Sequence, residues 1–285
     1  MSARLNLYCT GGKANVLGLV VITALLGYAL AANTSTSIWL GIIVALGTAL
    51  SCNGASILNQ VIERDTDRLM ARTRNRPVAS GVIPPAEALG VGLLEAIGGV
   101  VLLAVFANLL SGFIALLTAF IYVCVYTPLK RLTWLNTVVG AVPGALPPLG
   151  GWAAVTGSLD LPAWLLFAIV FIWQHPHFFA IAWLYREDYE KAGLCMLPVI
   201  DQKGDRVVRH IIAWTAVLFA VSLLPLFLGW FGPLSGAIVG LTGIYFLNSA
   251  LHFAGDKSNI AARQVIIRSV IYLPIVLSVY AIGMW

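Results

Sequence analysis

The chain has 285 residues and a formal net charge of +5, yet only 10% of its residues are charged and 60% are hydrophobic. Its mean hydropathy is +0.91, whereas soluble globular domains are roughly 45–50% apolar. These values exclude an ordinary soluble domain and give no indication of a nucleic-acid partner. The four cysteines are scattered without metal-binding or redox spacing, so we expect them to pack within the membrane.

Apolar runs recur along the whole chain, and each approaches the roughly 20 residues that a membrane-spanning helix needs. Only helices and closed barrels pair every backbone polar group in lipid, so these runs predict helices. The sequence therefore predicts an all-α polytopic membrane protein, a single domain over residues 1–285 with nine helices around a central cavity. The predicted spans are about 15–32, 38–60, 86–108, 112–127, 137–155, 163–185, 210–230, 234–254 and 265–284.

The basic residues fall on alternate loops. All 17 Lys and Arg lie before the first span, after the second, fourth and sixth, and around the junction of the eighth and ninth. Intervening loops such as AANTSTS and VTGSLDLP carry none. The positive-inside rule then places the N-terminus and the acidic loops at the cytoplasmic face of the plasma membrane.

The second span ends in NQVIERDTDRLMARTRNRP, which holds three acids and five arginines. On a helix, Asn59, Glu63 and Asp67 would follow one another at four-residue spacing and form a single polar stripe. Carboxylate and amide oxygens beside arginines suit Mg²⁺ with a diphosphate. Asp65 would point to the other side, toward Arg68 or Arg72. A solvated loop is the alternative, although it explains Asn59 and Glu63 poorly.

The next two motifs adjoin the fifth span. Lys130 and Arg131 follow the fourth span, where they are either ordinary interfacial anchors or further cations for a diphosphate. The fifth span, NTVVGAVPGALPPLGGW, contains three prolines and four glycines, and we expect them to break a regular helix. Such a segment either lines a cavity or permits close helix packing, and the sequence does not decide between these.

The sixth span carries the second acidic segment, FIWQHPHFFAIAWLYREDYEKAG. On a helix Trp173, His177 and Asp188 share one face, with His177 about 16 Å deeper in the membrane than Asp188. His175 points roughly opposite to His177. A polar side chain at that depth usually faces the bundle interior. An interhelical hydrogen bond, a proton relay and an axial ligand to haem iron are the open interpretations of these histidines.

These motifs together carry a resemblance. NQVIERDTD resembles the first acidic motif of the UbiA-type intramembrane prenyltransferase superfamily, N-x-x-x-[DE]-x-x-x-D. ERDTDRLMARTRNRP, YTPLKRLTWLNTVVGAVPGALPPLGGW, FIWQHPHF and DYEKAGLCMLPV are similar to its haem O synthase branch, the protohaem IX farnesyltransferases. The likeness runs from about residue 50 to residue 200, and several linked motifs occur in one order.

The resemblance implies an Mg²⁺-dependent transferase in the lipid bilayer. Its substrates would be farnesyl diphosphate and haem B, and farnesyl transfer to a vinyl group with addition of water would give haem O for terminal oxidases. A haem A synthase or a terminal oxidase assembly is a further expected partner. The alternatives are a prenyltransferase for an aromatic acid or quinone precursor, and a transporter or haem-handling protein without catalysis.

The resemblance also implies roles for individual residues. The expected metal-holding residues are Asn59, Glu63, Asp67 and Asp188, although Glu187 or Glu190 could replace Asp188. The expected diphosphate-binding residues are Arg64, Arg72, Arg76, Lys130 and Arg131. The expected haem or prenyl pocket consists of Tyr126, Trp173, Gln174, His175 and His177. Of these, His177 is the candidate for contacting haem iron or handling a proton.

Overall fold

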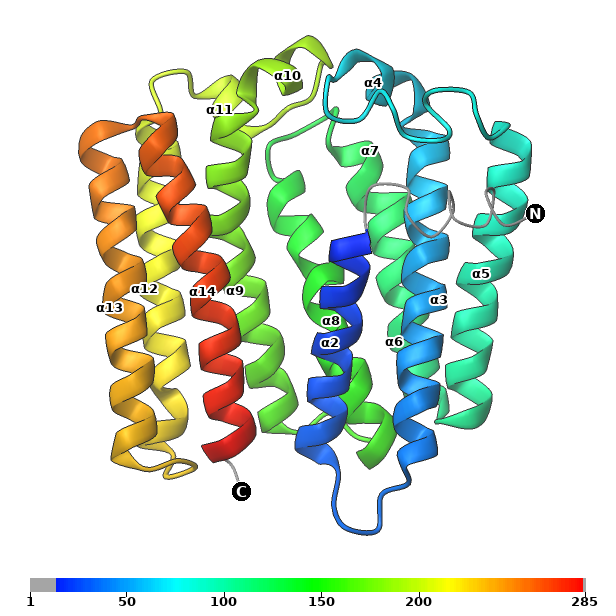
Figure 1. The fold of residues 1–285 in the computed structure, drawn as a ribbon, viewed down its shortest axis with the longest axis vertical. Coiled ribbons are helices and arrows are strands. Elements are labelled where there is room, and N and C mark those ends of the chain that lie inside the picture. The colour runs from blue at the N-terminus through cyan, green and yellow to red at the C-terminus, as the bar shows by residue number, and fades with distance from the viewer. Residues whose placement is uncertain (1–13, 284–285) are drawn as a thin grey trace.

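The computed structural model describes residues 14–283, and every regular element within that range is helical (Figure 1). A π-helical segment, η1, joins α6 to α7 without a break. The elements in chain order are α2 (Ala14–Ala31), α3 (Ile38–Ile62), α4 (Arg64–Leu69), α5 (Pro85–Phe106), α6 (Leu109–Phe120), η1 (Ile121–Tyr126), α7 (Thr127–Leu129), α8 (Asn136–Thr156), α9 (Leu161–Leu184), α10 (Arg186–Lys191), α11 (Leu197–Ile200), α12 (Asp205–Phe227), α13 (Pro233–Asp256) and α14 (Asn259–Gly283).

Each predicted span corresponds to one long helical segment, which confirms the all-α membrane architecture. Eight segments are long and apolar enough to cross a membrane, and the described part of α2 adds a shorter apolar helix over Val16–Ala31. The ninth span differs most, because it was expected from about residue 265 and α14 begins at Asn259. The helix accommodates Arg268 by placing the guanidinium 4.3 Å from the Tyr245 ring centroid and bonding it to Asn248.

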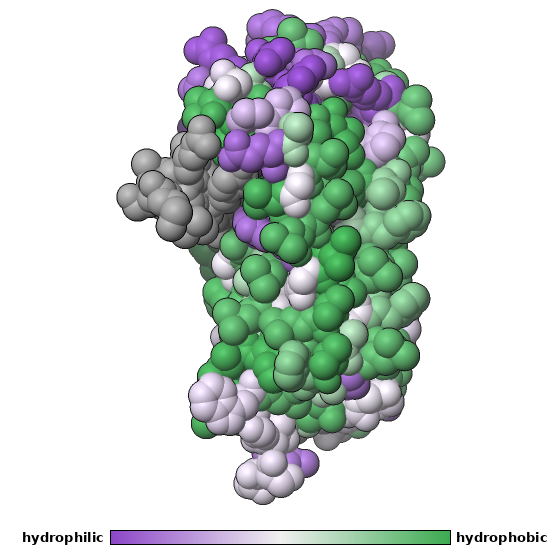
Figure 2. All heavy atoms as spheres, turned by 90° about the vertical axis from the view of Figure 1, so that its right-hand side faces the viewer, coloured by the Kyte–Doolittle hydropathy of each residue, from purple (hydrophilic) through white to green (hydrophobic). Residues whose placement is uncertain are grey.

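The two ends of the molecule differ sharply in polarity. The short helices α4, α10 and α11 lie together at one end, which is the upper end in Figure 1. Figure 2 shows hydrophilic residues concentrated at that end and a broad hydrophobic band below it. Large apolar side chains such as Leu94, Val105 and Leu241 are exposed on the outer helices. Exposed apolar surface of this kind fits a protein surrounded by lipid.

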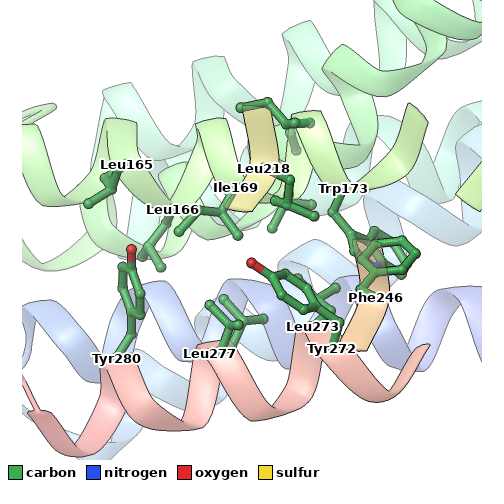
Figure 3. Packing of buried hydrophobic residues seen from close by; sticks show 14 of the residues in the cluster. Leu165, Leu166, Ile169, Trp173, Leu218, Phe246, Tyr272, Leu273, Leu277 and Tyr280 are labelled. Carbon is green, nitrogen blue, oxygen red and sulfur yellow. The ribbon is translucent and has the colours of Figure 1, made fainter. Parts of the chain in front are cut away.

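The central helix α9 forms the largest packed core. Its buried side chains Leu166 and Ile169 pack toward Leu277 and Tyr280 of α14, with α12 and α13 alongside (Figure 3). Pro176 lies within α9 but does not end it. Packing on several sides fixes the helix that carries the second group of predicted site residues.

The proline-rich fifth span corrects a prediction, because α8 is one continuous helix that contains Pro143, Pro147 and Pro148. Neighbouring helices press closely on it and hold it in shape. A Cβ at Gly151 would lie 1.8 Å from the Ala24 carbonyl oxygen, so α2 and α8 touch through their backbones. Glycine is therefore required there, in line with small-residue packing between membrane helices.

Of the four cysteines, Cys9 lies outside the described residues, and no disulfide joins any two of Cys52, Cys124 and Cys195.

Candidate active site

A cavity of about 520 Å³ lies inside the bundle, within the roughly 300–1,000 Å³ range of ligand pockets. Residues of α2, α3, α4, α5, α6, η1, α8, α9, α10 and α14 line it, together with the loops at the polar end. Acidic and basic groups gather toward the polar end of this lining, at Glu63, Asp67, Arg72, Arg76 and Lys130. The helix walls below them are mainly apolar and aromatic. The cavity therefore combines a charged end with a mainly apolar interior.

Glu63 lies at the junction between α3 and α4, so the first acidic stripe does not follow one uninterrupted helix as predicted. The φ of −90° and ψ of 7° at Glu63 depart from helical values, and α4 starts at the next residue. The four-residue hydrogen-bond spacing nevertheless persists, because Glu63 N donates to Asn59 O at 2.9 Å and Asp67 N donates to Glu63 O at 2.7 Å. The predicted proximity of the three residues thus survives the bend.

Asn59 is fully buried behind the cavity wall and links three elements. Its Nδ2 donates to Glu63 Oε2 and to Thr127 Oγ1, both at 2.9 Å. Its Oδ1 accepts a bond from the Tyr122 hydroxyl at 3.3 Å. The amide therefore orients the Glu63 carboxylate and ties it to the end of the fourth span.

Each acid of the stripe pairs with a basic side chain among the described residues. Lys130 Nζ lies 2.8 Å from Glu63 Oε1, and Arg76 Nη1 lies 2.7 and 2.8 Å from the two Asp67 oxygens. Burial alone would lower the pKa of Lys130, but nearby Tyr126 and Glu63 outweigh it and raise the pKa. The ammonium also lies 4.5 Å from the Tyr126 ring centroid. Two carboxylates and two basic side chains therefore lie close together at the polar end.

Asp65 points away from this cluster, as the helical spacing predicts. Its side chain is 69% exposed and pairs with Arg64 at 3.1 Å and Arg68 at 3.4 Å. The hydrogen bond from Arg64 holds the pKa of the Asp65 carboxyl below its usual value. Of the two arginines proposed as its partner, the structure selects Arg68.

Arg72 lies on the opposite side of the polar end, against aromatic rings. Its guanidinium lies 5.4 Å from the Tyr185 ring centroid, and Nη2 lies 3.4 Å from the Tyr189 hydroxyl. Burial raises the pKa of Tyr189. Since Arg72 has no acidic partner among the described residues, it is the cavity cation whose charge is not matched locally.

Two of the predicted diphosphate-binding residues do not line the cavity. Arg64 is engaged with Asp65 on the outer surface. Arg131 is exposed and bonds to the buried hydroxyl of Thr66. Both therefore contribute positive charge near the site while their side chains lie outside it.

Asp188 is half-buried on α10 and does not line the cavity, whereas the neighbouring Tyr189 does. Its carboxylate has no hydrogen-bond or ion-pair partner among residues 14–283. Glu187 and Glu190 are exposed. Asp188 is thus the most enclosed acid of the second segment, one residue from the cavity wall.

The interior wall contains most of the predicted pocket residues. Tyr126, Trp173, Gln174 and His177 all line the cavity. Gln174 Nε2 donates to the Ala141 and Val170 carbonyls at 3.0 and 3.1 Å, which fixes the amide against α8. His175 is not brought to the cavity, since its ring stacks on Trp214 with 4.0 Å between centroids.

Some lining and supporting residues were missed by sequence reasoning. Tyr122 and Thr127 support Asn59, and Tyr189 contacts Arg72. Gln60 lines the cavity, and its Oε1 is buried without a partner among the described residues. The sequence contains one signal for these residues: Tyr122 is a polar side chain in an apolar span, one helical turn before Tyr126. The remaining contacts join positions 60 or more residues apart, which spacing along the chain does not reveal.

The donor chemistry of the polar end fits Mg²⁺. Within residues 14–283 no three His, Cys, Asp or Glu side chains come together as a metal cluster. Glu63 and Asp67 present two carboxylates to the cavity, and the buried Asn59 amide bonds to Glu63 through Nδ2. Mg²⁺ is usually held by one or two carboxylates together with substrate phosphates and water, rather than by a complete protein cage. Two acids beside three cations match that mode of binding.

Two of the most similar known proteins have the same name. A protein from Solibacter usitatus named protoheme IX farnesyltransferase is 45% identical over 231 residues, covering 81% of this chain and 79% of that protein. A protein of the same name from Opitutus terrae is 40% identical over 282 residues, covering 99% and 95%.

Solved structures share the fold at low sequence identity. A digeranylgeranylglyceryl phosphate synthase matches with a TM-score of 0.83 at 20% identity and covers 99% of both chains. A UbiA homologue from Archaeoglobus fulgidus bound to DMAPP and Mg²⁺ matches with a TM-score of 0.74 at 15% identity, covering 96% of this chain and 99% of that one. The UbiA prenyltransferase family matches over residues 20–276. The chain therefore belongs to the UbiA prenyltransferase family.

Proposed function

We propose that this protein transfers the farnesyl group of farnesyl diphosphate to a vinyl group of protohaem IX, with addition of water, and so makes haem O. The main support for this proposal is that a single cavity contains both a cluster of acidic and basic side chains and an aromatic interior wall with His177. Relatives at 45% and 40% identity named protoheme IX farnesyltransferase support the choice of substrates.

The charged end would bind the diphosphate through Mg²⁺. Glu63 and Asp67, with Asn59 and Asp188, would hold the ion, which when bound stabilises negative charge on the leaving diphosphate. The Archaeoglobus fulgidus homologue bound to Mg²⁺ and DMAPP supports a metal-dependent reaction. Asp188 is included because it is half-buried, close to the cavity wall and without a partner among the described residues.

The cations of the cavity would neutralise the diphosphate as the allylic C–O bond breaks. Arg72, Arg76 and Lys130 line the cavity, and positive charge placed where negative charge develops lowers the barrier. Arg76 and Lys130 now pair with Asp67 and Glu63, so substrate binding would exchange those partners. Arg64 and Arg131 lie behind the site and would add only to the surrounding positive field.

The interior would shelter the allylic cation and position the acceptor. Aromatic faces such as Tyr126 and Trp173 stabilise a passing cation, and a largely apolar wall excludes bulk water. C1 of the farnesyl group would bond to the terminal vinyl carbon, water would add to the inner vinyl carbon, and one proton would be released. The product would carry a hydroxyethylfarnesyl side chain.

The protein would lie in the plasma membrane, and the positive-inside pattern supports an orientation with α4 and α10 at the cytoplasmic face. The diphosphate group of the substrate is strongly hydrated. Its binding site would therefore be expected at the polar end of the protein, which would face the cytoplasm. A terminal oxidase assembly, or a haem A synthase that converts haem O further, would receive the product.

The test is a direct conversion assay. Purified protein in detergent is incubated with haem B, farnesyl diphosphate and Mg²⁺, and the extracted haems are separated and weighed by mass spectrometry. We expect a product heavier by farnesyl plus water, which EDTA abolishes and added Mg²⁺ restores. Unchanged haem B, with prenylation of a hydroxybenzoate or quinone precursor by the same folded sample, would overturn the haem assignment.

A further inference from the structure

His177 is held by two neighbours on the interior wall of the cavity. Its Nδ1 lies 2.7 Å from Ser269 Oγ on α14. Its ring stacks on Trp173, with 4.8 Å between centroids and 17° between planes. The Trp173 Nε1 donates to the carbonyl of the same Ser269 at 2.7 Å. Ser269 of α14 thus bonds to both rings of this α9 pair, through its hydroxyl and its carbonyl. Figure 3 shows Trp173 on α9, on the side that packs against α14.

The hydrogen bonds of Ser269 determine the tautomer of His177. The Ser269 hydroxyl donates its single proton to Ile266 O at 2.6 Å. A hydroxyl oxygen has one proton and two lone pairs, so Oγ must accept from His177 Nδ1–H. The neutral ring therefore carries its proton on Nδ1 and a lone pair on Nε2. A histidine that binds a metal commonly uses one ring nitrogen while the other donates to an oriented oxygen.

The His177 nitrogen without a partner in residues 14–283, Nε2, is on a residue that lines the cavity. His177 lines the cavity, and no described residue other than Ser269 bonds its ring nitrogens. His175 is also bonded through Nδ1, to Phe171 O of its own helix, and its Nε2 has no partner among the described residues, but its ring is buried outside the cavity lining. Of the two histidines in this segment, only His177 presents an oriented acceptor nitrogen to a bound molecule.

We infer that Ser269 is a positioning residue that holds His177 in the Nδ1–H tautomer, so that Nε2 ligates the iron of the haem acceptor. This inference rests on the proposed function, since haem is the acceptor there. Ligation through Nε2 would anchor the macrocycle against the interior wall while the diphosphate stays at the charged end. Ser269 itself is fully buried and would not touch either substrate.

The chain contains a matched control for Ser269. Ser249 on α13 is equally buried, and its Oγ donates to Phe246 O at 2.6 Å, three residues back, as Ser269 does to Ile266. No histidine among the described residues bonds to Ser249. Replacing either serine by alanine removes the same helix-directed hydrogen bond, and only Ser269→Ala removes the partner of His177.

The experiment measures haem binding without turnover. Ferrous protohaem IX is titrated into purified protein without farnesyl diphosphate, and the iron–histidine stretching band is recorded by resonance Raman spectroscopy together with the haem Kd. Wild type and Ser249→Ala should show the band, and His177→Ala should lose it. Ser269→Ala should shift the band to lower frequency and weaken haem binding about 10–100-fold. Ser269→Thr, which keeps the hydroxyl, should restore both.

The outcomes separate this inference from the proposed function. A normal band and Kd in Ser269→Ala would overturn the positioning role. Production of haem O by a wild-type protein without an iron–histidine band would overturn ligation and leave the proposed function standing. Unaltered binding of farnesyl diphosphate with Mg²⁺ in each variant shows that the charged end is intact, so loss of haem ligation then supports the inference.

Discussion

Among single residues, Asp67 and Asp65 are two positions apart in the chain and have opposite environments. Asp67 is fully buried, lines the cavity and pairs with Arg76, whereas the Asp65 side chain is 69% exposed and pairs with surface arginines. In the proposed reaction, Asp67 would exchange this cation for Mg²⁺. An exposed ion pair contributes little free energy, because water already solvates both groups.

The first prediction follows from this contrast. Asp67→Asn should lower kcat for farnesyl transfer about 10²–10³-fold, the usual cost of removing one group that stabilises the transition state. Asp65→Asn should keep kcat within a few-fold of wild type. Steady-state kinetics with saturating Mg²⁺ measures both. Equal losses in the two variants would contradict the assignment of Asp67 to the metal.

The second prediction concerns the acids of α10. Asp188→Asn should lower kcat about 10²-fold, because Asp188 is the enclosed acid with no partner among the described residues. Glu187→Gln and Glu190→Gln are matched controls on exposed positions and should leave kcat nearly unchanged. The Mg²⁺ concentration for half-maximal activity should rise only in Asp188→Asn. A dominant effect of either glutamate would move the metal ligand to that residue.

At the scale of elements, α8 shows how neighbours override local sequence preference. Its three prolines predict a broken helix, yet α8 runs unbroken from Asn136 to Thr156. Glycines permit this, because they let α2 approach the α8 backbone directly: a Cβ at Gly27 would lie 1.9 Å from Pro148 O. Tight packing on both sides compensates for the hydrogen bonds that prolines cannot make.

The third prediction tests this packing. Gly151→Ala should destabilise the fold by about 1–3 kcal/mol, because its methyl group would strike the Ala24 carbonyl oxygen, which has no room to move. Gly98→Ala on α5 is the control, since a Cβ at Gly98 would meet no atom within 4 Å and alanine favours helices. Thermal unfolding in detergent should show a lower midpoint only for Gly151→Ala. Equal midpoints would mean that α2 and α8 are not in direct contact.

At the scale of the whole molecule, the distribution of charge supports one orientation in the membrane. The charged loops and the helices α4, α10 and α11 share one end, and the charged end of the cavity lies among them. Positively charged loops are retained on the cytoplasmic side during membrane insertion. The site for a diphosphate would therefore lie on the side where soluble diphosphates are available.

The fourth prediction tests the orientation. In a background whose native cysteines are replaced, Thr34→Cys, in the loop between α2 and α3, should react in intact cells with a membrane-impermeant maleimide. Glu187→Cys, at the other end, should react only after the membrane is permeabilised. Both positions are exposed, so accessibility differs only by side of the membrane. The reverse labelling pattern would invert the topology.

The sequence by itself determined the spans, the one-sided charge, and the proximity of Asn59, Glu63 and Asp67. These features depend on local properties: apolar length, loop charge and four-residue spacing, which survives even the bend at Glu63. The side that Asp65 faces was predictable for the same reason.

Only the tertiary structure decided which cation meets which acid, which histidine reaches the cavity and which nitrogen it presents. Lys130 meets Glu63 across 67 positions, and Ser269 meets His177 across 92. Such contacts arise from helix packing, which brings distant segments together at distances of a few ångströms, and a spacing along one helix contains no information about them. The chemistry of the site was therefore readable in its residue types, while its geometry depended on the packing of α9 against α8 and α14.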